Sequence, residues 1–296
     1  MSDAQLVVLF VFSGILGLLI GSFLNVCIFR LPRNCMSIRK PSRSRCPKCL
    51  TWIAWYDNIP VASWAVLGGK CRHCRNPISI RYALVELLTG GLFLYTGWRA
   101  IYGVASPGWP QAVQFAVEAW FVSALIVSTF IDLEFRILPD EITLSGVLIG
   151  LAASAAFPFL HAAELWRWGI PATPLMSAAA SALGAVVGGG SIYVVGVLGK
   201  LVFRKEAMGF GDVKYMAMVG AVLGWRGVLL TFVIACLWGS LFGIGKVIVT
   251  RRMGYVPFGP FLSVGALTML FFAPLVDRAI QAYLAFNHRL LDGILR

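Results

Sequence analysis

The chain has 296 residues, of which 59% are hydrophobic and only 13% are charged, and its formal net charge is +12. Its mean hydropathy of +0.81 lies outside the usual range of soluble domains, which excludes a soluble globular fold and indicates a polytopic membrane protein. The positive charge does not indicate a nucleic-acid partner, because the basic residues gather in loops on one side of the predicted spans.

Eight apolar stretches are predicted to cross the membrane, each judged against the roughly 20 residues that a spanning helix needs. The sixth is short, so a tilted or partly re-entrant helix is the alternative there. The glycine run in the fifth favours close helix packing over a phosphate loop, because no Lys-Ser/Thr follows it. The stretches cover residues 5–29, 83–102, 112–131, 142–160, 175–199, 213–224, 227–249 and 256–276.

The distribution of Lys and Arg predicts the orientation. Nineteen of the 25 basic residues lie on the side that holds residues 30–81. By the positive-inside rule this side is cytoplasmic and the N-terminus is outside. The first span is not expected to be a cleaved signal peptide, because the opening MSDAQ has no basic region.

The loop at residues 30–81 is the one sizeable soluble part of the sequence, and it contains two CxxC motifs. Cys46 and Cys49 form the first, and Cys71 and Cys74 form the second, with a spacing typical of a tetrahedral zinc site. A loop of about 50 residues with few aliphatic side chains cannot build much of a core, so a metal ion would supply folding free energy. Structural zinc is preferred over free thiols, and disulfides are disfavoured in a reducing cytoplasm.

The stretch between the two motifs, WIAWYDNIPVASWAVLGGK, is rich in aromatic residues around a single acid, Asp57. Such residues are enriched at membrane–water interfaces, and this interpretation is preferred to the alternative, the wall of a small-molecule pocket. His73, inside the second motif, is placed outside the metal shell. Cys27, Cys35 and Cys236 have no partner spacing and are interpreted as apolar filler.

Two aspartates occupy corresponding positions at the cytoplasmic ends of predicted spans. Asp132 ends the third span, in STFIDLEFRILPDE, and Asp212 opens the sixth, in KEAMGFGDVK. A carboxylate at a membrane boundary is costly and rare unless it serves a pathway, a pair or a reaction. Gly209 and Gly211 are expected to permit positive φ and the close approach of an extended peptide. For Asp212 alone, a polar loop that neutralises nearby lysines is the alternative. Neither aspartate shows a local structural role.

Two carboxylates in a partly dry site share a proton, so one acts as a base on water while the other donates to the peptide carbonyl. Such a pair titrates as a unit. No Ser-His-Asp or Cys-His arrangement competes, because none of the three histidines is suitably placed. The residues favour an aspartic protease and leave open a membrane transporter, or a zinc-stabilised scaffold, that uses the aspartates as an ion path.

Several long motifs resemble those of the bifunctional prepilin peptidases, also called type IV leader peptidase/N-methyltransferases. The resemblance covers nearly the whole chain. GFGD also fits the GxGD pattern of intramembrane aspartic proteases, which is a weak signal alone. In chain order the motifs are GSFLNV…RLP, the CxxC pairs around WYDNIPVASW, RYALVELLTG, FIDLEFRILPD, GFGDVK and VPFGPFL.

The resemblance implies that Asp132 and Asp212 are the catalytic aspartates and that the four cysteines mark a domain associated with methyl transfer. It implies cleavage of the short basic leader of type IV pilins and type II secretion pseudopilins, after a glycine, at the cytoplasmic face of the bacterial inner membrane. It also implies methylation of the new N-terminus, usually a phenylalanine, with S-adenosylmethionine as the donor. The residues that bind the donor are not identifiable, because no glycine-rich methyltransferase motif is present.

We therefore predict an all-α polytopic membrane protein with about eight transmembrane helices and a small cytoplasmic zinc-binding loop domain. Its expected parts are a first transmembrane helix at 1–29, the CxxC domain at 30–81 and a transmembrane aspartic peptidase domain at 82–296. The expected cofactors are structural zinc and S-adenosylmethionine. The expected partners are prepilin and pseudopilin substrates and the lipid bilayer, with no nucleic acid.

Overall fold

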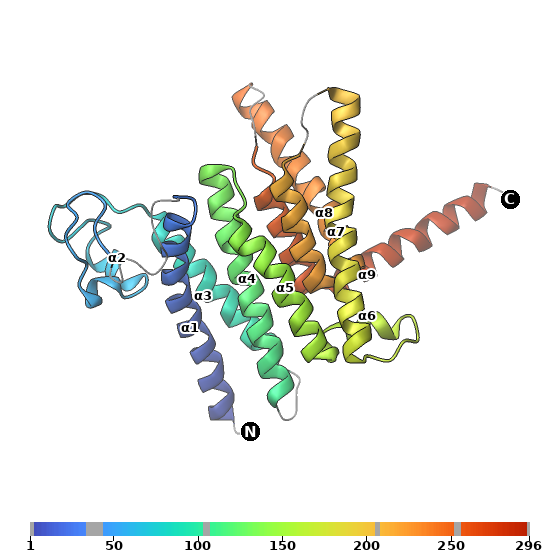
Figure 1. Cartoon of the computed structure of the whole chain (residues 1–296), viewed down its shortest axis with the longest axis horizontal. Coiled ribbons are helices and arrows are strands. Elements are labelled where there is room, and N and C mark those ends of the chain that lie inside the picture. Colours follow the sequence, from blue (N-terminus) through green and yellow to red (C-terminus); the bar gives the residue numbers. More distant parts are fainter. Residues whose placement is uncertain (1–2, 34–43, 103–106, 205–207, 252–255, 295–296) are drawn as a thin grey trace. The chain divides into compact units, whose positions relative to one another are not determined.

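The computed structural model describes residues 3–33, 44–102, 107–204, 208–251 and 256–294 of the chain (Figure 1). Within these residues the regular structure is helical, with two isolated β-bridges and no strand. The all-α prediction is therefore confirmed. In chain order the elements are α1 (Asp3–Arg30), η1 (Trp55–Asn58), α2 (Ala62–Val66), α3 (Arg81–Ile101), α4 (Trp109–Phe135), α5 (Asp140–Ala156), η2 (Pro158–His161), α6 (Ala162–Trp166), α7 (Pro174–Phe203), α8 (Phe210–Thr250) and α9 (Gly259–Ile294).

The helices form two compact units, Met1–Ile142 and Thr143–Arg296, and each is described by itself. Unit 1 holds α1 to α4 together with the cysteine-containing loop. Unit 2 holds most of α5 and everything that follows it. The predicted functional division at residues 30–81 stays a prediction.

Five described helices, α1, α4, α7, α8 and α9, are long and apolar enough to cross a membrane. The pair formed by α5 and the segment Pro158–Trp166, which is bent by 103°, would make a sixth span. The chain is thus a multi-pass membrane protein, but the predicted count of eight spans is not confirmed. Helix α3, on the predicted span 83–102, is not among the five, because Glu86 and Arg99 lower its mean hydropathy.

The predicted sixth and seventh spans fall together in α8, which is broken at Gly224 (φ 73°, ψ 173°). A Cβ placed on Gly188 of α7 would lie 2.9 Å from the carbonyl carbon of Met216 and 2.8 Å from Cγ2 of Val228. In a straight helix these two residues would be about 18 Å apart. The chain therefore reverses at Gly224, and α8 is a hairpin of two antiparallel arms. The break lies at the boundary between the two predicted spans, and the first arm, residues 210–223, is only about 21 Å long.

Small residues let the backbones of α7 and α8 touch (Figure 1). A Cβ on Gly184 would lie 2.8 Å from the carbonyl carbon of Gly220, and Ser181 Oγ donates a hydrogen bond of 2.7 Å to the Ala221 carbonyl. The predicted role of the glycine run in close packing is confirmed for Gly188, whereas Gly190 has open space beside it.

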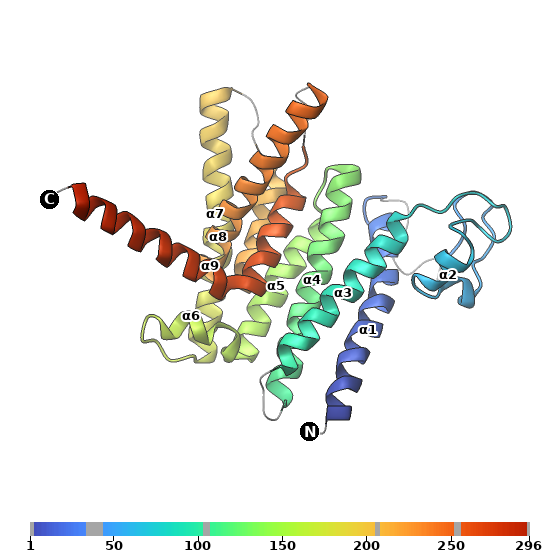
Figure 2. The same cartoon turned by 180° about the vertical axis from the view of Figure 1, so that it is seen from behind.

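In unit 1, α1 lies along α3 (Figure 2). The contact is a glycine face: a Cβ on Gly17 would lie 2.9 Å from Gly90 Cα, and one on Gly21 would lie 2.8 Å from Glu86 Cα. Asn25 Nδ2 extends the contact by donating a 3.0 Å hydrogen bond to the Tyr82 carbonyl. The close approach of the two helices thus follows from glycines spaced on one helical face.

Helix α9 is kinked at Phe272, two residues before Pro274, which lacks the N–H that a continuous helix would use. Just beyond the kink, Asp277 accepts hydrogen bonds from two arginines. Arg226, which follows the reversal of α8, approaches Asp277 Oδ1 to 2.8 Å, and Arg167 Nη2 lies 2.7 Å from Oδ2. An ion-paired cluster thus links the break of α8 at Gly224 to the kink of α9 at Phe272.

Replacing Gly224 by alanine is expected to destabilise the fold by about 1–3 kcal/mol, because only glycine tolerates this backbone conformation. The added Cβ would also overlap the carboxylate of Glu164, the far end of a side chain that pairs with His161. The measurement is the thermal unfolding midpoint in detergent, with Gly245→Ala as control, since nothing lies within 4 Å of a Cβ at Gly245. Adding Glu164→Ala should restore little stability. Equal unfolding midpoints for the Gly224 and Gly245 variants would contradict the expected backbone strain of an alanine at position 224.

Candidate functional site

The cysteine motifs form two loops of the same construction, here called the first metal loop (residues 45–52) and the second metal loop (residues 70–77). Each is closed by an isolated antiparallel bridge, Arg45 to Trp52 in the first and Lys70 to Pro77 in the second. In the first, the Cys46 N–H donates to the Thr51 carbonyl at 3.0 Å. In the second, the Cys71 N–H donates to the Asn76 carbonyl at 2.9 Å. The residue after the last cysteine has positive φ in both loops, at Leu50 and Arg75.

The two metal loops bring four thiols together. The Sγ atoms of Cys46, Cys49, Cys71 and Cys74 all lie within 4.8 Å of one another, and those of Cys46 and Cys74 are 3.8 Å apart. Four sulfurs bound to zinc at about 2.3 Å would be separated by about 3.8 Å. His73 is exposed and does not belong to the cluster, as predicted. The residues present therefore fit a tetrahedral zinc ion.

The surroundings of the outer thiols favour the thiolate form, which is the one that binds metal. The backbone N–H and side-chain amide of Asn76 lower the pKa of Cys74 to about 6. The hydroxyl and N–H of Thr51 lower the pKa of Cys49. Burial instead raises the pKa of Cys46 to about 11.

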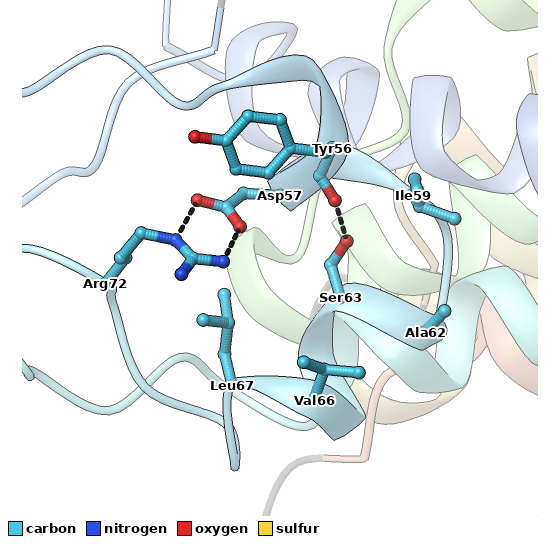
Figure 3. Close-up of a pocket in the computed structure, with 8 residues that line it drawn as sticks. All are labelled: Tyr56, Asp57, Ile59, Ala62, Ser63, Val66, Leu67 and Arg72. Atoms are coloured by element: carbon cyan, nitrogen blue, oxygen red, sulfur yellow. Dashed lines mark hydrogen bonds and ion pairs between the residues drawn. The ribbon is translucent and has the colours of Figure 1, made fainter.

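The segment between the metal loops is fixed to the second loop by polar contacts. Arg72, next to Cys71, donates from Nε to Asp57 Oδ2 at 2.8 Å and from Nη2 to Oδ1 at 2.5 Å (Figure 3). These hydrogen bonds hold the pKa of Asp57 below its usual value. Trp64 Nε1 donates to the Ile78 carbonyl at 3.1 Å. Several aromatic side chains of the segment are exposed, which is compatible with both predicted roles.

A buried carboxylate, not singled out from the sequence, joins this segment to helix α3 of unit 1. Glu86 of α3 accepts a hydrogen bond of 2.7 Å from the Val61 N–H. Val61 has positive φ (59°), and the Ala62 N–H bonds back to the Pro60 carbonyl, so the chain makes a rare and strained γ-turn there. The available signal was an acid inside a predicted apolar span, which is rarely without a role.

Asp132 lies in the last turn of α4 and is buried, with 6% of its surface exposed. The helix ends four residues later at Arg136, whose positive φ (59°) terminates it and whose N–H bonds to the Asp132 carbonyl. The carboxylate is therefore held at a helix end inside unit 1.

Asp212 lies in the first turn of α8. Its Oδ2 accepts a 3.2 Å hydrogen bond from the N–H of Gly209, which precedes the helix. The expectation that Asp212 has no local structural role is therefore wrong, since it caps α8. The positive φ that glycine permits is not adopted at either position: Gly209 has φ −77°, and Gly211 is helical. Gly209 is the N-cap residue of α8. Because Asp132 and Asp212 belong to different units, their pairing stays a prediction.

Comparison with known proteins places the chain in a family. The model described as the bacterial peptidase A24 N-terminal domain matches residues 15–100, and that of the type IV leader peptidase family matches residues 119–244. A relative from Stutzerimonas stutzeri is 34% identical, with 92% of each chain covered. The chain is a member of the type IV leader peptidase family.

Other relatives agree with this membership. A relative from Myxococcus xanthus is 42% identical over 82% of this chain, and the match spans 65% of that protein. One from Burkholderia pseudomallei (strain 1026b) is 34% identical, with 88% of this chain and 84% of the relative covered. All three relatives are named prepilin leader peptidase/N-methyltransferase. The predicted enzyme class is thereby confirmed. No solved structure shows a significant match.

Proposed function

We propose that the protein is a membrane aspartic endopeptidase that removes the basic leader of type IV prepilins and pseudopilins at the cytoplasmic membrane face and then methylates the new N-terminus. The observation that carries the proposal is the order of the family matches. The match to the N-terminal model contains all four cysteines, and the match to the peptidase model contains Asp132 and Asp212. Relatives that cover most of the chain bear a name with both activities.

In the proposed hydrolysis, Asp132 and Asp212 share one proton. The ionised carboxylate takes a proton from water, whose oxygen adds to the scissile carbonyl carbon, while the other carboxyl group gives its proton to the carbonyl oxygen. The carboxyl group that took the proton from water then gives it to the leaving nitrogen as the C–N bond breaks, while the other carboxylate takes back a proton from a hydroxyl of the tetrahedral intermediate. The products are the free leader and a mature chain with a new amine.

In the proposed methyl transfer, the lone pair of that amine attacks the methyl carbon of S-adenosylmethionine. The carbon–sulfur bond breaks with its electron pair left on sulfur, the nitrogen releases a proton, and S-adenosylhomocysteine departs. Zinc on Cys46, Cys49, Cys71 and Cys74 would supply rigidity to the cytoplasmic domain and takes no part in these steps.

We further propose that the bilayer delivers the substrate. The loop at residues 30–81 is strongly basic, so bulk electrostatics opposes a basic leader. Anionic headgroups instead attract basic segments of both molecules by about 1 kcal/mol per charge. A full prepilin in liposomes should therefore be cut far more efficiently than a soluble leader peptide that lacks the apolar helix.

The experiment compares kcat/KM for the two substrates in liposomes and in detergent, and mass spectrometry identifies the cleaved and methylated products. Equal efficiency on both substrates under both conditions would exclude delivery by the membrane. Failure to cut a full prepilin under any condition would overturn the proposed function itself.

A further inference from the structure

A hollow with a volume of about 100 Å³ lies in the loop region of unit 1, outside the thiol cluster (Figure 3). The Asp57–Arg72 pair and the ring of Tyr56 border it, and Val66 and Leu67 contribute apolar surface. The hollow therefore combines a charged edge, an aromatic edge and an apolar wall, which is the usual composition of a small-molecule site.

The walls of the hollow are held in place by contacts that the chain makes for itself. Ser63 Oγ donates a 2.8 Å hydrogen bond to the Tyr56 carbonyl, which joins α2 to η1 (Figure 3). The Asp57 side chain is only 8% exposed, whereas that of Arg72 is 47% exposed. Because Arg72 follows Cys71 directly, the second metal loop sets its position. A metal on the cysteines would thus also fix the charged edge of the hollow.

Arg72 has hydrogen-bonding capacity left over. Its Nε and Nη2 are engaged by Asp57, while Nη1 makes no hydrogen bond to any described residue. A guanidinium with a free edge is suited to a ligand carboxylate. The hollow thus offers a donor for an anion beside the Asp57 carboxylate.

The charged groups of S-adenosylmethionine, the proposed methyl donor, match the groups that border this hollow. S-adenosylmethionine carries a sulfonium, an ammonium and a carboxylate, so it needs partners for two cations and one anion. Between residues 31 and 85 the sequence contains a single acid, Asp57, among many basic residues. Exposed aromatic faces, which also attract cations, stand beside it: Tyr56 is 50% exposed and Trp55 is 81% exposed.

We propose that this hollow binds the methionyl end of S-adenosylmethionine, with the ligand carboxylate on Arg72 and its cationic centres beside Asp57 and Tyr56. The adenosine lies outside, against the exposed Trp55, because the hollow is smaller than the roughly 300 Å³ of a site that encloses a whole cofactor. The inference rests on the proposed methyl transfer and gives that activity a binding site.

The test measures binding of S-adenosylmethionine and S-adenosylhomocysteine to the full-length, zinc-loaded protein in detergent. Arg72→Gln should weaken S-adenosylmethionine binding at least 10-fold and slow methylation, with leader cleavage within twofold of wild type. Arg75→Gln is the matched control, because it removes the same charge from an exposed position in the same metal loop. It should leave S-adenosylmethionine binding and methylation unchanged. Ala62→Leu, which fills the hollow without altering charge, should weaken binding as Arg72→Gln does.

A further comparison separates recognition from a loss of folding. Tyr56→Leu should weaken S-adenosylmethionine more than S-adenosylhomocysteine, because only the former carries the sulfonium, and zinc content should stay at the wild-type value. Wild-type affinity in both Arg72→Gln and Ala62→Leu would overturn the assignment of the hollow. A wild-type protein that cleaves but neither binds the donor nor methylates would instead overturn the proposed methyl transfer.

Discussion

Asp132→Asn and Asp212→Asn are each expected to lower leader cleavage by about 10³-fold or more, because each removes one of the two groups that move protons in the proposed hydrolysis. The measurement is the single-turnover rate on a full prepilin in liposomes. Both variants should remain folded, since an asparagine oxygen at position 212 can still accept the hydrogen bond from Gly209.

Matched controls for this result lie close by. Glu134→Gln removes a carboxylate two residues after Asp132, but Glu134 is exposed and paired with Arg33 and Arg81. Its loss should change cleavage by less than about threefold, in line with the small contribution of exposed ion pairs. Asp140→Asn should behave in the same way. Near-wild-type cleavage by either the Asp132 or the Asp212 variant would remove that residue from the mechanism.

The second large effect concerns metal. Wild-type protein purified without chelators is expected to contain one zinc ion per chain, and Cys46→Ser or Cys71→Ser should abolish binding. The CxxC domain has little apolar core that could supply the folding free energy of the missing metal. Its residues 44–80 should therefore become sensitive to proteolysis, and methylation should fall more than 10-fold while cleavage falls far less. Elemental analysis, limited proteolysis and product mass spectrometry measure the three effects.

Cys236→Ser provides the control for the metal experiment, because it makes the same chemical change in unit 2, far along the chain from the metal loops. It should retain zinc and both activities. The absence of zinc from wild-type protein would refute the site. Retention of methylation by metal-free protein would separate the cysteines from that activity.

The sequence was sufficient for features that depend on spacing alone. The CxxC pairs identified the thiol cluster, because metal-loop geometry follows from the positions of the cysteines. The boundary between the sixth and seventh predicted spans located the reversal at Gly224. Cys27 is buried and unpaired as expected of filler, Cys236 is partly exposed, and Cys35 lies outside the described residues.

Other features were not predicted, one of them a local helix cap and the rest set by tertiary contacts. The capping role of Asp212 was missed because Gly209 and Gly211 were interpreted as conformationally flexible positions. Gly209 is instead the N-cap residue of α8. Glu86 and Arg72 acquire their roles from Val61 and Asp57, which are 25 and 15 residues away in the sequence. The number of candidate membrane spans differed from the predicted eight in part because polar residues in α3 reduce its mean hydropathy without ending the helix.

The hairpin of α8 also sets how far a substrate must reach in the proposed hydrolysis. Met216 lies level with Gly188, and from there α7 continues to Phe203, a rise of about 22 Å, whereas the first arm of α8 reaches Asp212 after only about 6 Å. Asp212 is thus recessed by about 16 Å below the end of α7, a depth that about five extended residues span. In the proposed hydrolysis, with the end of α7 at the headgroups, a leader must be at least this long for its basic residues to stay there while its scissile bond is beside Asp212. The minimum length of a cleavable leader is then a measure of that depth.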